Sequence, residues 1–177
     1  MRAVVLCLAL AHVHGCSPRP PPADLVFVGG PVYTQDASRL WAEALAVRGE
    51  TIVSVGARAD VEVFVGKSTQ IIDLDGRLLL PRLKDDALVA IHEAVTGRTL
   101  RGTTISRKLE RIEDAIGKHA SSALVVGSPA DLTVLQENIL KIAPERIAEA
   151  KVEMSVVDGH VVYVALTFDQ RSSRTLE

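Results

Sequence analysis

Short apolar runs separated by glycine-containing turns occupy both ends of this chain, and segments with helical periodicity lie between them. The strongest turn signal is Asp158-Gly159, which stands between two β-rich runs, as Gly49-Glu50 does earlier in the chain. Strand-forming runs cover residues 23–30, 32–34, 43–48, 51–55, 70–73, 77–80, 130–135, 151–157 and 160–165. Blocks of strands at both ends with helices between them predict an α+β fold.

Apolar residues at helical spacing predict a short helix at 58–65, longer helices at 86–96 and 106–125, and a helical turn at 144–150. The apolar stripes on the two longer helices are Leu88, Ile91 and Val95 on the first, and Leu109, Ile112 and Ile116 on the second. Each buried Leu or Ile contributes roughly 1.5–3 kcal/mol, so leaving both stripes in water would be costly. We expect them to pack on each other, on the sheets or on another subunit.

Length and charge narrow the range of functions. The chain has 177 residues, which suits one domain of ordinary size with a real core. Aromatic residues make up only 3%, so Val, Leu, Ile and Ala must build that core. The formal net charge of −2 argues against a nucleic-acid partner recruited by bulk charge.

The first residues predict a targeting signal rather than folded structure. Arg2 precedes a short apolar run at 3–11, and the run Val13-His14-Gly15-Cys16-Ser17 resembles a bacterial lipoprotein cleavage site. We expect residues 1–16 to be a lipoprotein-type signal peptide and Cys16 to be lipidated. The protein would then be lipid-anchored in the cell envelope or periplasm. An ordinary secretory signal, giving a secreted protein, is the alternative.

The remaining boundaries follow from composition. The proline-rich tract at 17–22 predicts a stiff, extended tether. The folded domain is expected at 23–166, with a helical insert at about 85–126 and a flexible polar tail at 167–177. Removal of the signal would take Cys7 away, so no disulfide framework is expected.

Two blocks of the chain carry a family resemblance. The first ends with IIDLDGRLLLP at residues 71–81, and the second contains ADLTVL at 130–135, IAEAKV at 147–152 and VVDGHVVY at 156–163. The segment 23–81 resembles the amino-terminal part of the amidohydrolase superfamily, in its amidohydrolase 3 or N-substituted formamide deformylase-like branch. The second block is similar to the closing strands of the same enzymes, and the helical segments 86–99 and 106–125 resemble the end of their barrel.

The resemblance implies a fold with its middle missing. In the family, both chain ends build one small β-sandwich beside a TIM barrel, which alone takes about 250 residues. A proline equivalent to Pro81 leads there to His-x-His on the first barrel strand, whereas Arg82-Leu83-Lys84-Asp85-Asp86 follows here. We therefore expect an internally deleted member: a composite β-sandwich from N- and C-terminal strands, with two helices left from the end of a lost barrel.

The parent chemistry implied by the resemblance is metal-dependent hydrolysis of carbon–nitrogen bonds other than peptide bonds. One or two divalent metals such as zinc acidify a bound water, and His-x-His on a strand places both imidazoles on one face. We expect this chain to be inactive alone and to bind no cofactor, because it lacks that ligand set. A non-enzymatic envelope binding or scaffold module, a defective gene product, and a barrel supplied by a separate chain are the alternatives.

Other residues suited to catalysis or metal binding have simpler explanations. The only His-x-His, His12-Val13-His14, lies in the signal segment. We expect His92 at a helix interface, His119 on a solvated helix face and His160 at a strand start. Asp85 or Asp86 can cap a helix, and Asp73 and Asp75 flank a turn. Gly127-Ser128 follows a helix, which is the wrong context for an activated serine. We therefore expect no catalytic, cofactor-binding or metal-binding residue. The partner we expect is a second copy or a barrel-supplying chain, bound through exposed helix stripes.

Overall fold

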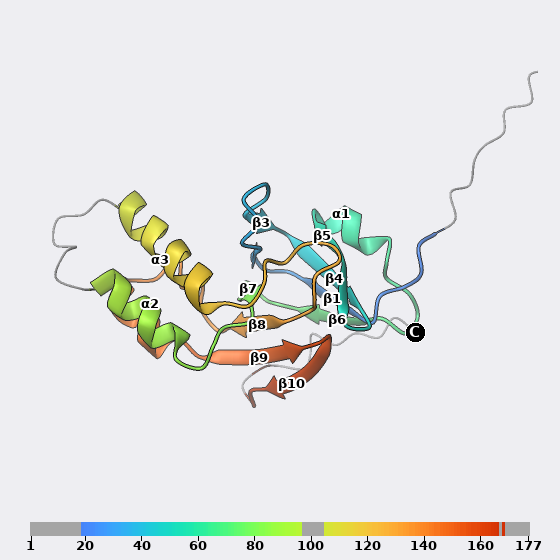
Figure 1. Cartoon of the computed structure of the whole chain (residues 1–177). Coiled ribbons are helices and arrows are strands. Elements are labelled where there is room, and N and C mark those ends of the chain that lie inside the picture. Colours follow the sequence, from blue (N-terminus) through green and yellow to red (C-terminus); the bar gives the residue numbers. More distant parts are fainter. Residues whose placement is uncertain (1–18, 97–104, 167, 169–177) are drawn as a thin grey trace, which may run out of the picture.

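The computed structural model describes residues 19–96, 105–166 and 168 (Figure 1). The expected signal peptide at 1–16, with Cys7, His12, His14 and Cys16, lies outside the described residues. The elements in chain order are β1 (Leu25–Val28), β2 (Val32–Tyr33), β3 (Trp41–Ala42), β4 (Ala44–Arg48), β5 (Thr51–Gly56), α1 (Arg58–Glu62), β6 (Gln70–Asp73), β7 (Leu78–Pro81), α2 (Ala87–Thr96), α3 (Ile105–His119), β8 (Leu132–Leu135), the 3₁₀ helix η2 (Pro144–Glu149), β9 (Val152–Val157) and β10 (His160–Val164).

The strands form two sheets that share a core. One sheet has the order β5-β4-β1-β6 and the other β10-β9-β8-β7-β2-β3. Leu25 and Phe27 of the first sheet are buried in one cluster with Leu79, Leu132 and other residues of the second. Strands from both ends of the chain therefore enclose one interior, which confirms the expected α+β class and the composite arrangement of two sheets.

The chain crosses between the sheets at two neighbouring turns. Gly29-Gly30 links β1 to β2, and Asp75-Gly76 links β6 to β7, with the Gly76 N–H donating to the Gly29 carbonyl at 2.8 Å. Gly29 and Gly76 have φ values of 77° and 78°, which favour glycine. The expected turn at Asp75-Gly76 is therefore confirmed. It links strands of two different sheets rather than the two strands of a hairpin.

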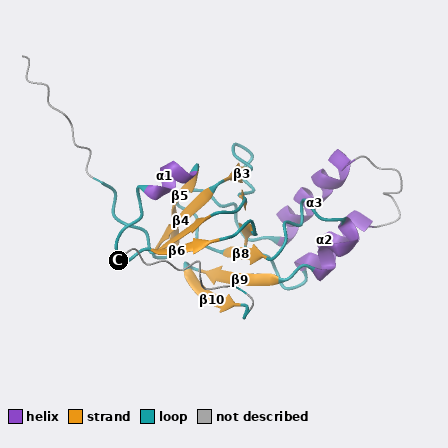
Figure 2. Ribbon diagram, turned by 180° about the vertical axis from the view of Figure 1, so that it is seen from behind, coloured by secondary structure: helices purple, strands orange, loops and turns teal. Residues whose placement is uncertain are grey.

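Each sheet also has a covered outer face. Val26 and Val28 of β1 point away from the shared core and pack with Val61 of α1. On the other sheet, Leu78 and Leu80 of β7 pack with Ile91 of α2, as part of a cluster that also holds Ile112 and Ile116 of α3 and Ile147 of η2. Figure 2 shows α1 against the β4–β5 side and the α2–α3 pair at the opposite end. Strands buried on both faces explain why β1 and β7 read as continuous apolar runs.

The segment between β7 and α2 is tied into the domain by backbone hydrogen bonds. The Arg82 N–H donates to the Asp131 carbonyl at 2.9 Å, and the Arg82 carbonyl accepts from the Ser121 N–H at 2.8 Å. The Lys84 N–H donates to the His119 carbonyl at 2.9 Å, and Leu83 forms a β-bridge with Ala120. This segment thus lies between the start of β8 and the end of α3.

The second long helix ends earlier than expected. We predicted a helix over 106–125, but α3 ends at His119. Leu124 is buried in the core between the sheets, and its N–H donates to the Thr34 carbonyl at 2.7 Å. Ser121 and Ser122 favour the non-helical conformation, since serine competes with helical hydrogen bonds. The burial of Leu124 therefore outweighs the helical pattern.

The two ends of the described chain also pack on the domain. The Ala23 N–H donates to the Phe64 carbonyl at 2.8 Å, and Arg48 Nη1 donates to the Pro21 carbonyl at 3.0 Å. Phe168 falls within the expected tail at 167–177, but its ring is 6% exposed, lies in the shared core and has the Arg77 guanidinium 5.2 Å from its centroid. The rest of that range lies outside the described residues.

We expect truncation of Leu79 to destabilise the domain, because its side chain is fully buried between the sheets. Leu79→Ala should lower the free energy of unfolding by about 2–5 kcal/mol. The matched control is Val162→Ala on β10 of the same sheet, where the side chain is 61% exposed and the loss should stay within about 0.5 kcal/mol. Urea unfolding followed by circular dichroism measures both. Equal losses would contradict the arrangement of the core.

Candidate functional site

His92 of α2 makes a contact between two helices. Its Nδ1 lies 3.0 Å from the Pro144 carbonyl oxygen and donates to it, since a carbonyl can only accept. Pro144 begins η2, and the ring is half-buried. Packing between α2 and η2 therefore explains the position of the His92 side chain, as the sequence predicts.

His119 and His160 lie on other elements and have local roles. His119 is the last residue of α3, where its carbonyl accepts the bond from Lys84. His160 begins β10 and is exposed, with its Nδ1 2.8 Å from the Asp158 carbonyl oxygen. The three histidines thus come from two helices and a hairpin.

The acidic residues near the junction and the turns are solvated. Asp85 and Asp86 are exposed, and the Asp86 carbonyl accepts from the Ala90 N–H at 3.0 Å in the first turn of α2. Asp73 Oδ1 accepts from the Asp75 N–H at 2.9 Å, which stabilises the turn where Asp75 has a φ of 48°. The Ser128 carbonyl accepts from the Ile52 N–H, so that segment runs along the edge of β5.

The possible metal ligands are dispersed among the described residues. Within residues 19–96, 105–166 and 168, no three His, Cys, Asp or Glu side chains come together in a way that could hold a metal ion. Nor does any helix in these ranges have the length and apolarity needed to cross a membrane.

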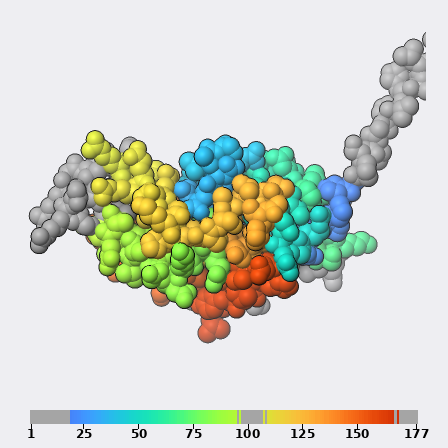
Figure 3. Space-filling view, viewed as in Figure 1, coloured from blue at the N-terminus to red at the C-terminus, as the bar shows by residue number. Residues whose placement is uncertain are grey.

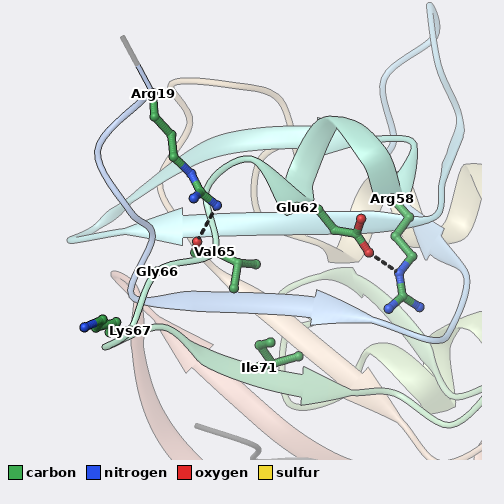
Figure 4. A pocket seen from close by; sticks show the side chains of 7 residues that line it. All are labelled: Arg19, Arg58, Glu62, Val65, Gly66, Lys67 and Ile71. Atoms are coloured by element: carbon green, nitrogen blue, oxygen red, sulfur yellow. Dashed lines mark hydrogen bonds and ion pairs between the residues drawn. The ribbon is translucent and has the colours of Figure 1, made fainter. Parts of the chain in front are cut away.

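Among the hollows on the described surface, two are lined by charged side chains of different segments. The larger is an open groove of about 620 Å³, shown in Figure 4, lined by Arg19, Arg58, Glu62, Val65, Gly66, Lys67 and Ile71. A smaller one of about 320 Å³ lies beside the junction, between Arg82–Asp85 and the strands β8 to β10. Sequence reasoning missed the larger groove, because Arg19 and Lys67 are far apart in the chain and neither belongs to a motif.

A buried phenol and a carboxylate meet where α3 covers the sheet. Burial, together with the nearby Glu113 carboxylate, raises the pKa of Tyr33 to about 12. Burial also raises the pKa of Glu113 itself, with a further contribution from Glu110. The Tyr33 ring makes an edge contact with Trp41, with centroids 5.2 Å apart. Both shifts mean that burial at this interface disfavours the ionised forms of these groups.

The raised pKa predicts a loss of stability at high pH. Above the ordinary tyrosine pKa of 10.0 the unfolded chain loses the Tyr33 proton, whereas the folded chain keeps it until about pH 12. The free energy of unfolding should therefore fall as the pH rises through this interval. Tyr163→Phe leaves Tyr33 as the only tyrosine, so ultraviolet titration reports its pKa alone. Tyr33→Phe should reduce this pH dependence by the contribution of Tyr33. A titration centred on pH 10.0 would contradict the burial.

Comparisons with known proteins agree with the resemblance over the second half of the chain. Residues 103–163 match the family described as Amidohydrolase family, which covers α3, β8, η2, β9 and most of β10. No solved structure matches the chain. Protein LONG AFTER FAR-RED 3 of Arabidopsis thaliana is 27% identical over 108 residues, which is 59% of this chain and 18% of that relative. The chain therefore spans less than a fifth of the relative's length. The family match supports membership of the amidohydrolase superfamily.

Proposed function

We propose that this chain is an envelope-located domain of the amidohydrolase superfamily that does not itself hydrolyse carbon–nitrogen bonds. The parent chemistry needs a water molecule acidified by one or two divalent metals. Such a site requires several His or acidic ligands at fixed distances. The described histidines are instead used for packing and turns, as His92 is in its contact with Pro144.

The observation that carries this proposal is the course of the chain after β7. Pro81 pairs with Leu132 of β8, and the next residue, Arg82, bonds to Asp131 and Ser121. In the resembling enzymes the equivalent position leads to His-x-His on a barrel strand. Here the backbone leads directly to α2, and the bonded junction supports an internally deleted frame, with α2 and α3 retained from the end of the barrel.

We expect the purified chain to contain no stoichiometric divalent metal and to hydrolyse none of a panel of N-formyl, cyclic amide and cyclic imide compounds. Metal analysis after growth with added zinc, and release of amine or carboxylate, are the measurements. His92→Ala and His119→Ala should leave the metal content unchanged, because neither imidazole has a partner ligand among the described residues.

One result would overturn the proposal. Stoichiometric zinc that is lost in His92→Ala or His119→Ala, but retained in the exposed control His160→Ala, would show that the chain assembles a metal site. Hydrolysis that depends on that metal would then restore the enzymatic assignment.

A non-enzymatic binding module is the second candidate, and the exposed edge strand β10 favours it. All five residues of β10 are exposed, and the strand ends its sheet next to β9. The only titratable side chains of β10 are the His160 imidazole and the Tyr163 phenol. Solvent-exposed edge strands, by contrast, are usually protected by charged side chains. The helix stripes that first suggested a partner are largely covered: Ile91, Ile112 and Ile116 are buried within the chain itself.

For this candidate we propose a second copy as the partner, with two β10 strands pairing antiparallel about a two-fold axis. Sedimentation velocity should show concentration-dependent dimers. Val162→Lys should shift the chain to monomers by placing two like charges at the pair, while Val89→Lys on the exposed side of α2 should not. A monomer at every concentration would contradict this proposal. If Val89→Lys gave monomers and Val162→Lys did not, the contact between the two copies would lie on the helices instead.

A further inference from the structure

The large groove lies where the described chain begins. Arg19, the first described residue, donates from Nε to the Val63 carbonyl at 3.2 Å and from Nη2 to the Val65 carbonyl at 3.0 Å. Figure 4 shows its guanidinium beside Val65, with Lys67 on the following loop and Arg58 on α1. The groove is open to solvent and holds about 620 Å³.

Positive charge prevails among the residues that line this groove. It has three cationic side chains, Arg19, Arg58 and Lys67, and one carboxylate, Glu62. Glu62 pairs with Arg58 at 2.7 Å, which leaves the other two cations unopposed within the lining. Arg19 bonds only to neutral carbonyl oxygens there, and Lys67 is exposed on its loop. Val63, whose carbonyl holds Arg19, adds an apolar side chain that is 45% exposed.

The segment that enters the domain is fixed beside the groove. A Cβ on Gly66 would lie 2.6 Å from the Cβ of Pro22, so the proline packs directly against that loop. Arg48 holds the Pro21 carbonyl, and Ala23 bonds to Phe64. The first residues of the domain therefore cannot swing away from the groove without breaking these contacts.

Chain length then limits how far the groove can lie from a lipid on Cys16. Arg19 lies three positions after Cys16, and a fully extended chain spans at most about 3.6 Å per residue, or about 11 Å in all. The α2–α3 pair lies at the far end of the domain from this segment, as Figures 1 and 3 show. A lipid-anchored chain would therefore turn the groove toward the bilayer and the helix pair away from it.

We propose that this face binds the phosphate groups of anionic phospholipids at the membrane surface, an inference that rests on the envelope location proposed above. Arginine and lysine are the side chains that recognise phosphate, by forked and by point-charge bonds respectively. Cations near an anionic bilayer strengthen binding by about fivefold each. Arg19 and Lys67 supply the cations that are not paired with the groove's carboxylate.

The test uses the full chain with Cys16→Ser, which cannot be acylated, mixed with vesicles of phosphatidylglycerol and phosphatidylcholine at a ratio of about 1:3. Co-sedimentation should show binding that weakens with salt and exceeds binding to phosphatidylcholine alone. Lys67→Glu should weaken binding to the anionic vesicles by about 25-fold, since it removes one positive charge and adds one negative charge. The matched control Lys84→Glu, at the distant junction, should change it less than about twofold.

Three results would overturn the proposal: equal binding to both vesicle types, equal losses in the two variants, or displacement by inorganic phosphate at constant ionic strength. The last would identify free phosphate as the ligand. Mass spectrometry of the wild-type chain from the envelope separately tests acylation of Cys16. If the wild-type chain is not acylated but still binds anionic vesicles, the lipid anchor on Cys16 is refuted and the proposed phospholipid-binding groove is not.

Discussion

The fold depends on the packing of β7 on both of its faces. Leu79 points into the core shared by the two sheets, while Leu78 and Leu80 point into the core beneath α2 and α3. The strand also pairs with β2 from the amino-terminal block and with β8 from the carboxy-terminal block. Because apolar burial is the main favourable term in folding, this one strand couples the two halves of the chain and both of these cores.

The junction after β7 connects the amino-terminal and carboxy-terminal blocks within one domain. Backbone groups on both sides of Arg82 are paired, so the segment incurs no penalty for buried unpaired donors. The helices that follow cover the outer face of the six-stranded sheet rather than the strands of a barrel. Family membership is supported by the match over residues 103–163.

The two ends of the domain offer different surfaces. At one end, Arg19 and Lys67 line a basic groove beside the point where the chain enters. At the other, α2 and α3 bury Ile91, Ile112 and Ile116 of their apolar stripes, while the edge strand β10 exposes all five of its residues. The proposed roles therefore do not compete for the same residues: a lipid surface would occupy the groove, and a second copy would occupy the strand edge.

The sequence by itself determined the positions of the strands other than β3, the hairpins at Gly49-Glu50 and Asp158-Gly159, and the start of α2, because period-two alternation, continuous apolar runs and turn residues are local signals. It also indicated that His92 packs at an interface. Only the tertiary structure decided that α3 stops at His119, since the buried position of Leu124 depends on contacts with distant strands. The sheet assignment of each strand and the groove around Arg19 and Lys67 were likewise decided there, because long-range packing brings those residues together and no local pattern encodes it.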